Sequence, residues 1–212
     1  METALNQLLL ELGQVYERSP IKQYCLQNGY EWYYSLVTTA MEKGYPLILG
    51  FNWGASQNGK YSAQSLITQL KFKDQDLGSL SRIFPYCKEY LGCDFLDKAS
   101  QSNYCFFRSN KENQITPEDV ELCKHIFEKL IDVVQPSSIL CFSAKLRDYL
   151  IENKRLSNCQ IEVIEYKRGS VNMTYLAMKA ILNSGVEIKF LPHPNYPITN
   201  VARSEAWEFC CS

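Results

Sequence analysis

Apolar residues in the first part of the chain recur at the spacing of an α-helix. The first set consists of Leu5, Leu8, Leu12, Val15 and Tyr16. It predicts a helix that ends near Ser19-Pro20, because proline cannot continue a helix. Residues 20–43 are predicted to form a second helical region, with Trp32, Leu36 and Ala40 on one stripe and Gly44 after its end.

Short apolar runs bounded by turn residues follow, and such runs are typical of buried parallel strands. We predict strands over residues 46–51, 103–107, 138–142 and 186–191, with residues 161–164 as an alternating edge strand. Helices are predicted between them, over residues 77–91 with a break at Pro85, over 116–135, over 144–152 and over 171–182. The helix over residues 116–135 has the clearest start signal, since Thr116 suits a helix cap and Pro117 suits the first turn.

Strands that alternate with helices predict an α/β fold, in three α/β/α layers around a mainly parallel central sheet of about four strands. The chain has 212 residues and no linker-like segment, so we expect one domain, with N-terminal helices over residues 1–44 and a core over residues 45–212. Ligands of such sheets bind outside the carboxyl ends of the strands. There we expect two segments to meet in one pocket: Gly50-Phe51-Asn52-Trp53-Gly54 and His193-Pro194-Asn195.

Composition and charge narrow the class of protein. A hydrophobic fraction of 46% with 21% charged residues is typical of globular chains. No apolar run approaches the roughly 18 residues that a membrane span needs, so no membrane partner is expected. The acidic start, Met1-Glu2-Thr3, does not resemble a secretory signal, which favours a cytoplasmic monomer. A net charge of −1 means that any nucleic acid would have to bind a local basic face.

Nine cysteines raise the question of disulfides or a metal site. Their number is odd, and no two of them stand two to four positions apart, as zinc and iron–sulfur sites usually require. Several lie inside apolar runs, where free cysteine behaves as a small hydrophobic residue. We therefore expect reduced thiols, no metal and no cofactor, and we leave Cys210-Cys211 without a role.

Three polar residues stand at the predicted strand ends. His193 directly follows the last strand between two prolines, which restrict the direction in which it points. The other histidine, His125, lies within a predicted helix and is more simply structural. Asn52 follows the first strand and Asn103 begins the second. Taken singly, each residue is equally compatible with an ordinary turn or core position.

In order along the chain, these residues resemble the motifs of the uracil-DNA glycosylase superfamily. That superfamily has Gly-x-Asn-Pro-Gly after its first strand, an asparagine on a strand that reads the base, and His-Pro-Ser after its last strand. The matching segments here are Gly50-Phe51-Asn52-Trp53-Gly54, Ser102-Asn103-Tyr104-Cys105 and His193-Pro194-Asn195. The segment Ser56-Gln57-Asn58-Gly59-Lys60-Tyr61 is similar to the Ala-Gln-Thr-Gly-x-Pro-Phe loop of the Asn-type members.

The resemblance implies a monofunctional glycosylase that hydrolyses the N-glycosidic bond of uracil, or of a related damaged base, in DNA. It implies that Asn52 holds the attacking water and that His193 donates a hydrogen bond to O2 of the departing base.

The same resemblance assigns the remaining contacts. Asn103 would pair with the edge of uracil, while Tyr61, with Phe51 beside it, would bind the face of the base. The segment after His193 would contact DNA through Asn195, Tyr196 and Ile198.

Two positions depart from the family pattern. Trp53 stands where the family has proline, and Asn195 stands where it has serine. A second hypothesis is therefore a non-catalytic module of the same fold that binds a nucleobase or nucleic acid, with Trp53 filling the pocket. A third is a small-molecule hydrolase, which is disfavoured because the chain has no Gly-x-Ser-x-Gly elbow and neither histidine has an evident nucleophile beside it.

Overall fold

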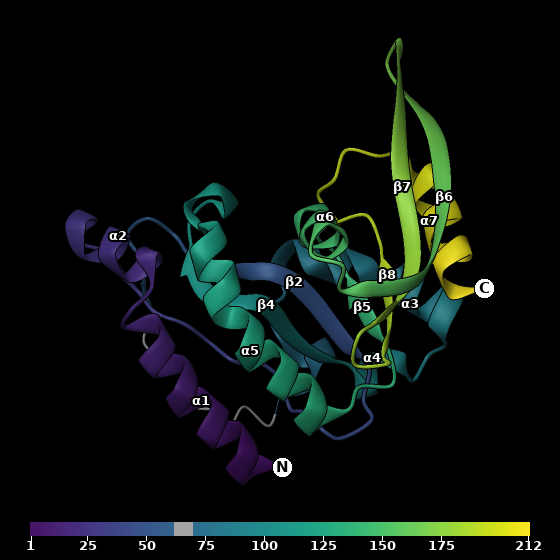
Figure 1. Cartoon of the computed structure of the whole chain (residues 1–212). Coiled ribbons are helices and arrows are strands. Elements are labelled where there is room, and N and C mark those ends of the chain that lie inside the picture. The colour runs from purple at the N-terminus through teal and green to yellow at the C-terminus, as the bar shows by residue number, and fades with distance from the viewer. Residues whose placement is uncertain (62–69) are drawn as a thin grey trace.

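The structure is a computed structural model that describes residues 1–61 and 70–212. Its central sheet has six strands in the order β4-β2-β5-β8-β7-β6 (Figure 1). The first four run parallel: β4 (Ser100–Ser109), β2 (Leu47–Gly54), β5 (Ile139–Cys141) and β8 (Glu187–Phe190). A long antiparallel hairpin of β7 (Val171–Leu182) and β6 (Leu156–Arg168) completes the sheet. The predicted α/β class and the mainly parallel sheet are confirmed, and β7 is the one strand of these six that was not predicted as a strand.

Helices cover both faces of the sheet. On one face lie α1 (Glu2–Tyr16), α5 (Pro117–Val134) and α6 (Ala144–Glu152), whose buried residues belong to one hydrophobic cluster. On the other face lie α3 (Phe84–Leu91), α4 (Phe95–Lys98) and α7 (Asn200–Cys211), which pack into a second cluster. Strand β2 contributes to both, since Leu47, Leu49 and Phe51 enter the first and Ile48 the second. Burial on both faces explains its unbroken apolar run.

The second predicted helix is much shorter than its pattern suggested. Helix α2 (Pro20–Asn28) ends at Gly29, whose φ of +69° belongs to the left-handed region that glycine favours. Trp32 lies instead in β1 (Glu31–Trp32), which pairs with β3 (Lys60–Tyr61). Its indole is buried and donates a hydrogen bond to the Ser56 carbonyl at 3.0 Å. The part of the predicted helix over residues 29–43 is therefore wrong, because Trp32 packs into the small β1–β3 sheet and not on one face of a helix.

The prediction of a helix over residues 171–182 is also wrong. This segment is strand β7, paired with β6 on one side and with β8 on the other. Its residues alternate between the two clusters: Tyr175 and Ala177 enter one, and Met178, Ala180 and Leu182 the other. A strand with apolar residues on both faces shows no clear period of two, which is why it resembled a helix.

Other predicted elements keep their places with changed boundaries. Residues 77–91 divide into the 3₁₀ helix η2 (Gly78–Ile83) and α3, and Pro85 lies in the first turn of α3, where proline is tolerated, and does not break it. The predicted edge strand extends over the whole of β6. Two further 3₁₀ turns are η1 (Phe72–Asp74) and η3 (Glu112–Gln114). In the described part of the chain, no helix is long and apolar enough to cross a membrane.

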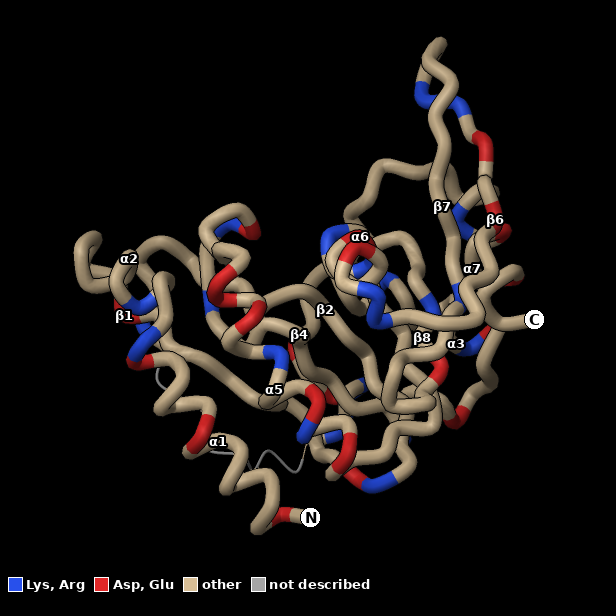
Figure 2. Tube along the Cα trace, in the orientation of Figure 1, with Lys and Arg blue, Asp and Glu red and all other residues tan. Residues whose placement is uncertain are grey.

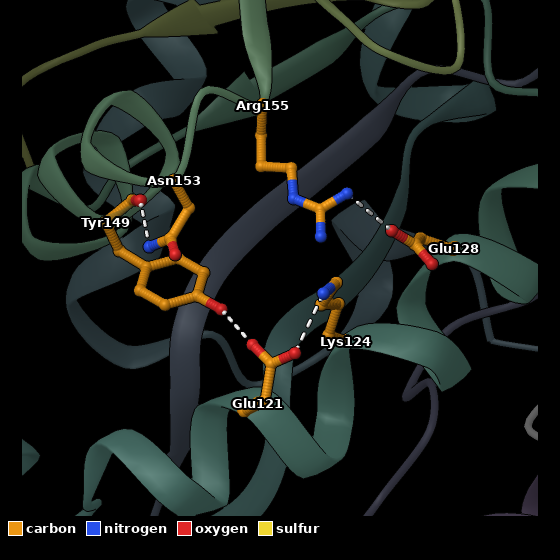
Figure 3. A network of polar contacts seen from close by, with 6 residues as sticks. All are labelled: Glu121, Lys124, Glu128, Tyr149, Asn153 and Arg155. Carbon is orange, nitrogen blue, oxygen red and sulfur yellow. Dashed lines mark hydrogen bonds and ion pairs between the residues drawn. The ribbon is translucent and has the colours of Figure 1, made fainter.

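Side chains on the surface connect α5 to α6 and to the segment after it (Figure 3). The Tyr149 hydroxyl donates to Glu121 at 3.0 Å, and Lys124 pairs with the same carboxylate at 2.8 Å. Arg155 reaches Glu128 on α5 at 3.3 Å. These contacts are partly solvated, so each contributes little alone, and together they hold the two helices in register.

The start of α5 forms as predicted, and its capping residues also hold α2. Asp119 is fully buried, and one carboxylate oxygen accepts hydrogen bonds from the Thr116 backbone N–H and hydroxyl at 2.9 and 2.8 Å. The other oxygen accepts from the Ile21 N–H on α2 at 3.0 Å. Thr116 in turn caps the helix through the Asp119 N–H. One carboxylate therefore joins two helices.

We predict that Asp119→Ala lowers the free energy of unfolding by about 3 kcal/mol, because it leaves buried N–H groups without an acceptor. The neighbouring exposed residue provides a matched control, and Glu118→Ala should cost less than about 1 kcal/mol. Urea denaturation followed by circular dichroism measures both values. Equal losses for the two variants would show that the buried carboxylate does not join the helices.

Candidate functional site

Both segments that were predicted to meet contribute to one cavity, the second of them through His193 alone. A hollow of about 240 Å³ opens at the carboxyl ends of β2, β5 and β8, beside β4. Residues 50–54 line it together with Asn103, and His193 lines it from the loop after β8. Asn52, Asn103 and His193, which are far apart in the sequence, thus face the same space. This position is the one that parallel α/β sheets commonly use for ligands.

Asn103 presents its carboxamide to this cavity. Its residue is 4% exposed, and no described residue makes a hydrogen bond to its side chain. Gly50 is its register partner on β2, and a Cβ added there would lie 2.2 Å from the Asn103 Oδ1 atom. The Asn103 carboxamide therefore fits against β2 only because position 50 has no side chain. The donors and the acceptor of this carboxamide are therefore open to a molecule in the cavity.

Asn52 is held in a single orientation. Its Nδ2 donates to the Trp53 carbonyl at 2.9 Å and to the Ser109 hydroxyl at 2.8 Å. Ser109 in turn donates to the Lys111 carbonyl at 2.9 Å. Because a backbone carbonyl can only accept, the amide cannot be flipped, and Oδ1 is the atom left for another donor. The pairing of β2 with β4 shifts register here, and such irregularities commonly redirect a side chain beside a site.

Trp53 borders the cavity, but its ring is anchored elsewhere. The indole N–H donates to the Ser35 carbonyl, and the Arg108 guanidinium lies 5.8 Å from the ring centre. Arg108 also donates to the Ser35 hydroxyl at 2.9 Å and to the Gly54 carbonyl at 3.0 Å. Neither Ser35 nor Arg108 lines the cavity among the residues described. The Trp53 ring is therefore held at the border of the pocket and leaves the pocket open.

His193 lies at the mouth of the cavity with a defined ring orientation. Its Nδ1 accepts a hydrogen bond from the Asn195 backbone N–H at 3.1 Å, so in the neutral ring the proton is on Nε2. Loss of solvent around the imidazole lowers the pKa of His193, and the positive charge of Arg203 lowers it further. Near neutral pH the side chain is therefore an uncharged donor through Nε2.

Arg203, on α7, holds the loop that carries His193. One terminal nitrogen of its guanidinium donates to the Pro192 and His193 carbonyls, each at 3.1 Å. The other donates to the Tyr196 carbonyl at 2.9 Å and to the Pro194 carbonyl at 3.4 Å. The residue is 9% exposed, so these bonds are made away from bulk water. Its place on a helix, ten residues from His193, gave no sign of this role in the sequence.

The aromatic residues divide differently from their predicted roles. Phe51 is a cavity residue, and its ring is covered by Lys145 at 4.2 Å. Tyr61 is not among the described cavity residues; its ring lies 4.8 Å from Arg108 and its hydroxyl bonds to Ser56. Phe142, directly after β5, lines the cavity and was missed. It could have been found by the same strand-end argument that indicated Asn52 and His193.

The residues predicted to contact DNA line a neighbouring groove. Asn195, Tyr196 and Ile198 face this second space of about 460 Å³, which the His193 loop separates from the cavity. The Asn195 carboxamide is occupied there, since it accepts from Arg82 at 3.1 Å and donates to Ser79 at 3.0 Å. Ile198 is half-buried against the second hydrophobic cluster.

Comparisons with known proteins do not identify a family for this chain. Neither a scan against models of protein families nor a search of curated proteins finds a match for this chain. Within residues 1–61 and 70–212, no group of three or more His, Cys, Asp or Glu side chains is placed to hold a metal ion. All nine cysteines are free thiols.

We predict that Arg203→Met raises the pKa of His193 towards its ordinary value, because both a nearby positive charge and the ordered loop are lost. A pH titration of the histidine NMR signals measures it, and His125 provides an internal reference in the same spectrum. Arg18→Met, which changes an exposed arginine between α1 and α2, is the matched control. An unchanged titration of His193 in Arg203→Met would show that Arg203 does not lower the pKa of this imidazole.

Proposed function

We propose that the cavity binds a single nucleobase and that the protein hydrolyses the N-glycosidic bond of uracil, or of a related damaged base, in DNA. The observation that carries this proposal is that Asn52, Asn103 and His193 line one cavity, with the Asn103 carboxamide close against Gly50 and without a hydrogen bond to a described residue. A fixed amide can accept from N3–H and donate to O4 of uracil, whereas cytosine presents the opposite pattern. The carboxamide thus forms both hydrogen bonds only with the matching base.

His193 and Asn52 supply groups suited to the chemical step. Cleavage develops negative charge on the departing base and positive charge on the sugar. A neutral imidazole donating through Nε2 stabilises the charge on the base oxygen, and it acts strongly because its orientation is set beforehand. The free Oδ1 of Asn52 accepts a hydrogen bond from the attacking water and so orients it. An amide cannot remove the proton itself, so turnover is expected to be modest.

Phe142 takes over the stacking role that was given to Tyr61. The ring is 5% exposed, lines the cavity and lies in the second hydrophobic cluster together with Ile48. A base removed from its helix is read at its edge and stacks on an aromatic face. Trp53 borders this space, but its indole is bonded to the Ser35 carbonyl and lies near Arg108, which favours the catalytic hypothesis over a pocket closed by tryptophan.

The proposed reaction is tested with labelled oligonucleotides that contain one uracil, followed by alkaline cleavage at abasic sites. We expect product with the wild-type chain and a rate lowered roughly 10²-fold in both Asn52→Ala and His193→Ala. Exposed His125→Ala is the matched histidine control and should keep the wild-type rate. Absence of product on single-stranded, G·U and A·U substrates would contradict the function, and full activity of His193→Ala would contradict the site.

The role of the Gly50–Asn103 contact is tested by adding one methyl group. In Gly50→Ala the new Cβ must displace the carboxamide, so we expect kcat/KM for uracil excision to fall roughly 10²-fold. Gly54→Ala, in the same strand, is the control, because its Cβ meets no atom of the described residues within 4 Å. Thermal unfolding should show both variants folded. Equal kcat/KM values for the two variants would show that the Asn103 carboxamide does not recognise the base.

A further inference from the structure

The hairpin of β6 and β7 projects from the body of the molecule (Figure 1). Met178 on β7 pairs with Phe190, the last residue of β8, so residues 171–177 continue beyond the end of β8 and are paired with β6. At about 3.3 Å for each residue, this length corresponds to an arm of roughly 23 Å. We call residues 162–177 the arm. It extends in the direction in which β8 leads to His193, which is the side on which the cavity opens.

The tip of the arm carries two cations that are open to a ligand. Lys167 and Arg168 end β6, and a two-residue turn that begins at Gly169 follows. Gly169 has a φ of +62°, which glycine favours at the first position of such a turn. Both cations are exposed, and neither side chain makes a hydrogen bond or an ion pair with a described residue. Residues 166–173 contain no acidic side chain, and the nearest one along the chain is Glu165.

These two cations differ from basic residues nearer the body of the sheet. Arg155 pairs with Glu128 at 3.3 Å, and Lys189 pairs with Glu187 at 3.3 Å. Basic and acidic residues are interspersed along the chain (Figure 2), and the net charge is −1. The overall charge therefore does not attract a polyanion, and such a partner must be bound by cations that are unpaired and adjacent.

The arm is held in place at its base. The Tyr175 ring lies 5.6 Å from that of Tyr196, which belongs to the loop after His193. Arg147 on α6 donates a hydrogen bond to the Leu176 carbonyl at 3.0 Å. Helix α7 packs against β6. The fold therefore sets the direction of the arm relative to the cavity and presents its tip at a defined place.

A two-stranded ribbon with cations at its tip has the shape and the charge to bind a DNA duplex. The major groove is about 12 Å wide and admits such a ribbon, and Lys and Arg side chains bind the phosphates at its borders. The free edge of β6 is less suited to pairing with a second copy of the chain, because Glu162, Glu165 and Lys167 place charged side chains along it.

We propose that the arm enters the major groove of the DNA duplex beside the base in the cavity, with Lys167 and Arg168 on its phosphates. The inference rests on the proposed function in one respect: it takes DNA as the partner. Because each strand of a duplex has one phosphate about every 3.4 Å along the axis, an arm of roughly 23 Å reaches up to about six base pairs from the base in the cavity. The arm thus adds a contact with the duplex at a distance from the His193 loop.

The test is fluorescence anisotropy of a labelled, undamaged DNA duplex titrated with the full chain at several salt concentrations. The double variant Lys167→Ala/Arg168→Ala should weaken binding roughly tenfold and reduce the slope of log K against log salt by about 1.8, the value for two phosphate contacts on a duplex. Lys167→Arg/Arg168→Lys should keep the wild-type slope, because it keeps both charges. Lys43→Ala/Lys98→Ala is the matched control. It removes two exposed cations just before the amino ends of β2 and β4, at the opposite edge of the sheet, and should leave binding and slope unchanged.

Measuring uracil excision by the wild-type chain separates this inference from the proposed function. Excision together with duplex binding and a salt slope that are unaffected by Lys167→Ala/Arg168→Ala would overturn the role of the arm and leave the function standing. Duplex binding that depends on the two cations, without any excision, would support the arm and overturn the function. A wild-type chain that binds no duplex would overturn the arm as a DNA contact. A wild-type dimer that dissociates in the double variant, observed by analytical ultracentrifugation, would assign the arm to a second copy of the chain and would also overturn the proposal.

Discussion

Close packing of β2 against β4 at Gly50 determines the shape and chemistry of the cavity. Because position 50 has no side chain, the Asn103 carboxamide can lie directly against the neighbouring strand. A molecule with complementary groups can form hydrogen bonds with this carboxamide. The position of the carboxamide in the cavity therefore depends on how closely the two strands pack.

The rest of the site is held by residues that do not face the ligand. Ser109 orients Asn52, and Arg203 orders the loop that carries His193. Ser35 and Arg108 hold Trp53 beside the cavity. Each of these contacts joins segments that are distant in the sequence or in different elements. Preorganisation of this kind keeps donors aimed at the positions where charge develops, so that little reorganisation is needed during a reaction.

Prediction from the sequence succeeded where local signals and tertiary environment agree. The cap of α5 combines a threonine, a proline and acids in the order that a helix start requires, and it forms as expected. It failed where packing overrides the pattern. Residues 171–182 are apolar on both faces because helices cover both sides of β7, and a strand of that kind has no readable period. Trp32 has the spacing of a residue on the apolar face of a helix, but it lies in the two-stranded sheet of β1 and β3.

The sequence by itself determined the α/β class, the mainly parallel strands and the place of His193 after the last core strand, since these follow from apolar runs and turn residues along the chain. Asn52, which was predicted to follow its strand, lies within β2 because that strand continues to Gly54. It could not show that Tyr61 lies apart from the cavity, that Phe142 faces it, or that Arg203 clamps the His193 loop. Those facts depend on which segments become neighbours after folding. Side-chain partners are selected by three-dimensional distance, and no pattern along the chain encodes that distance directly.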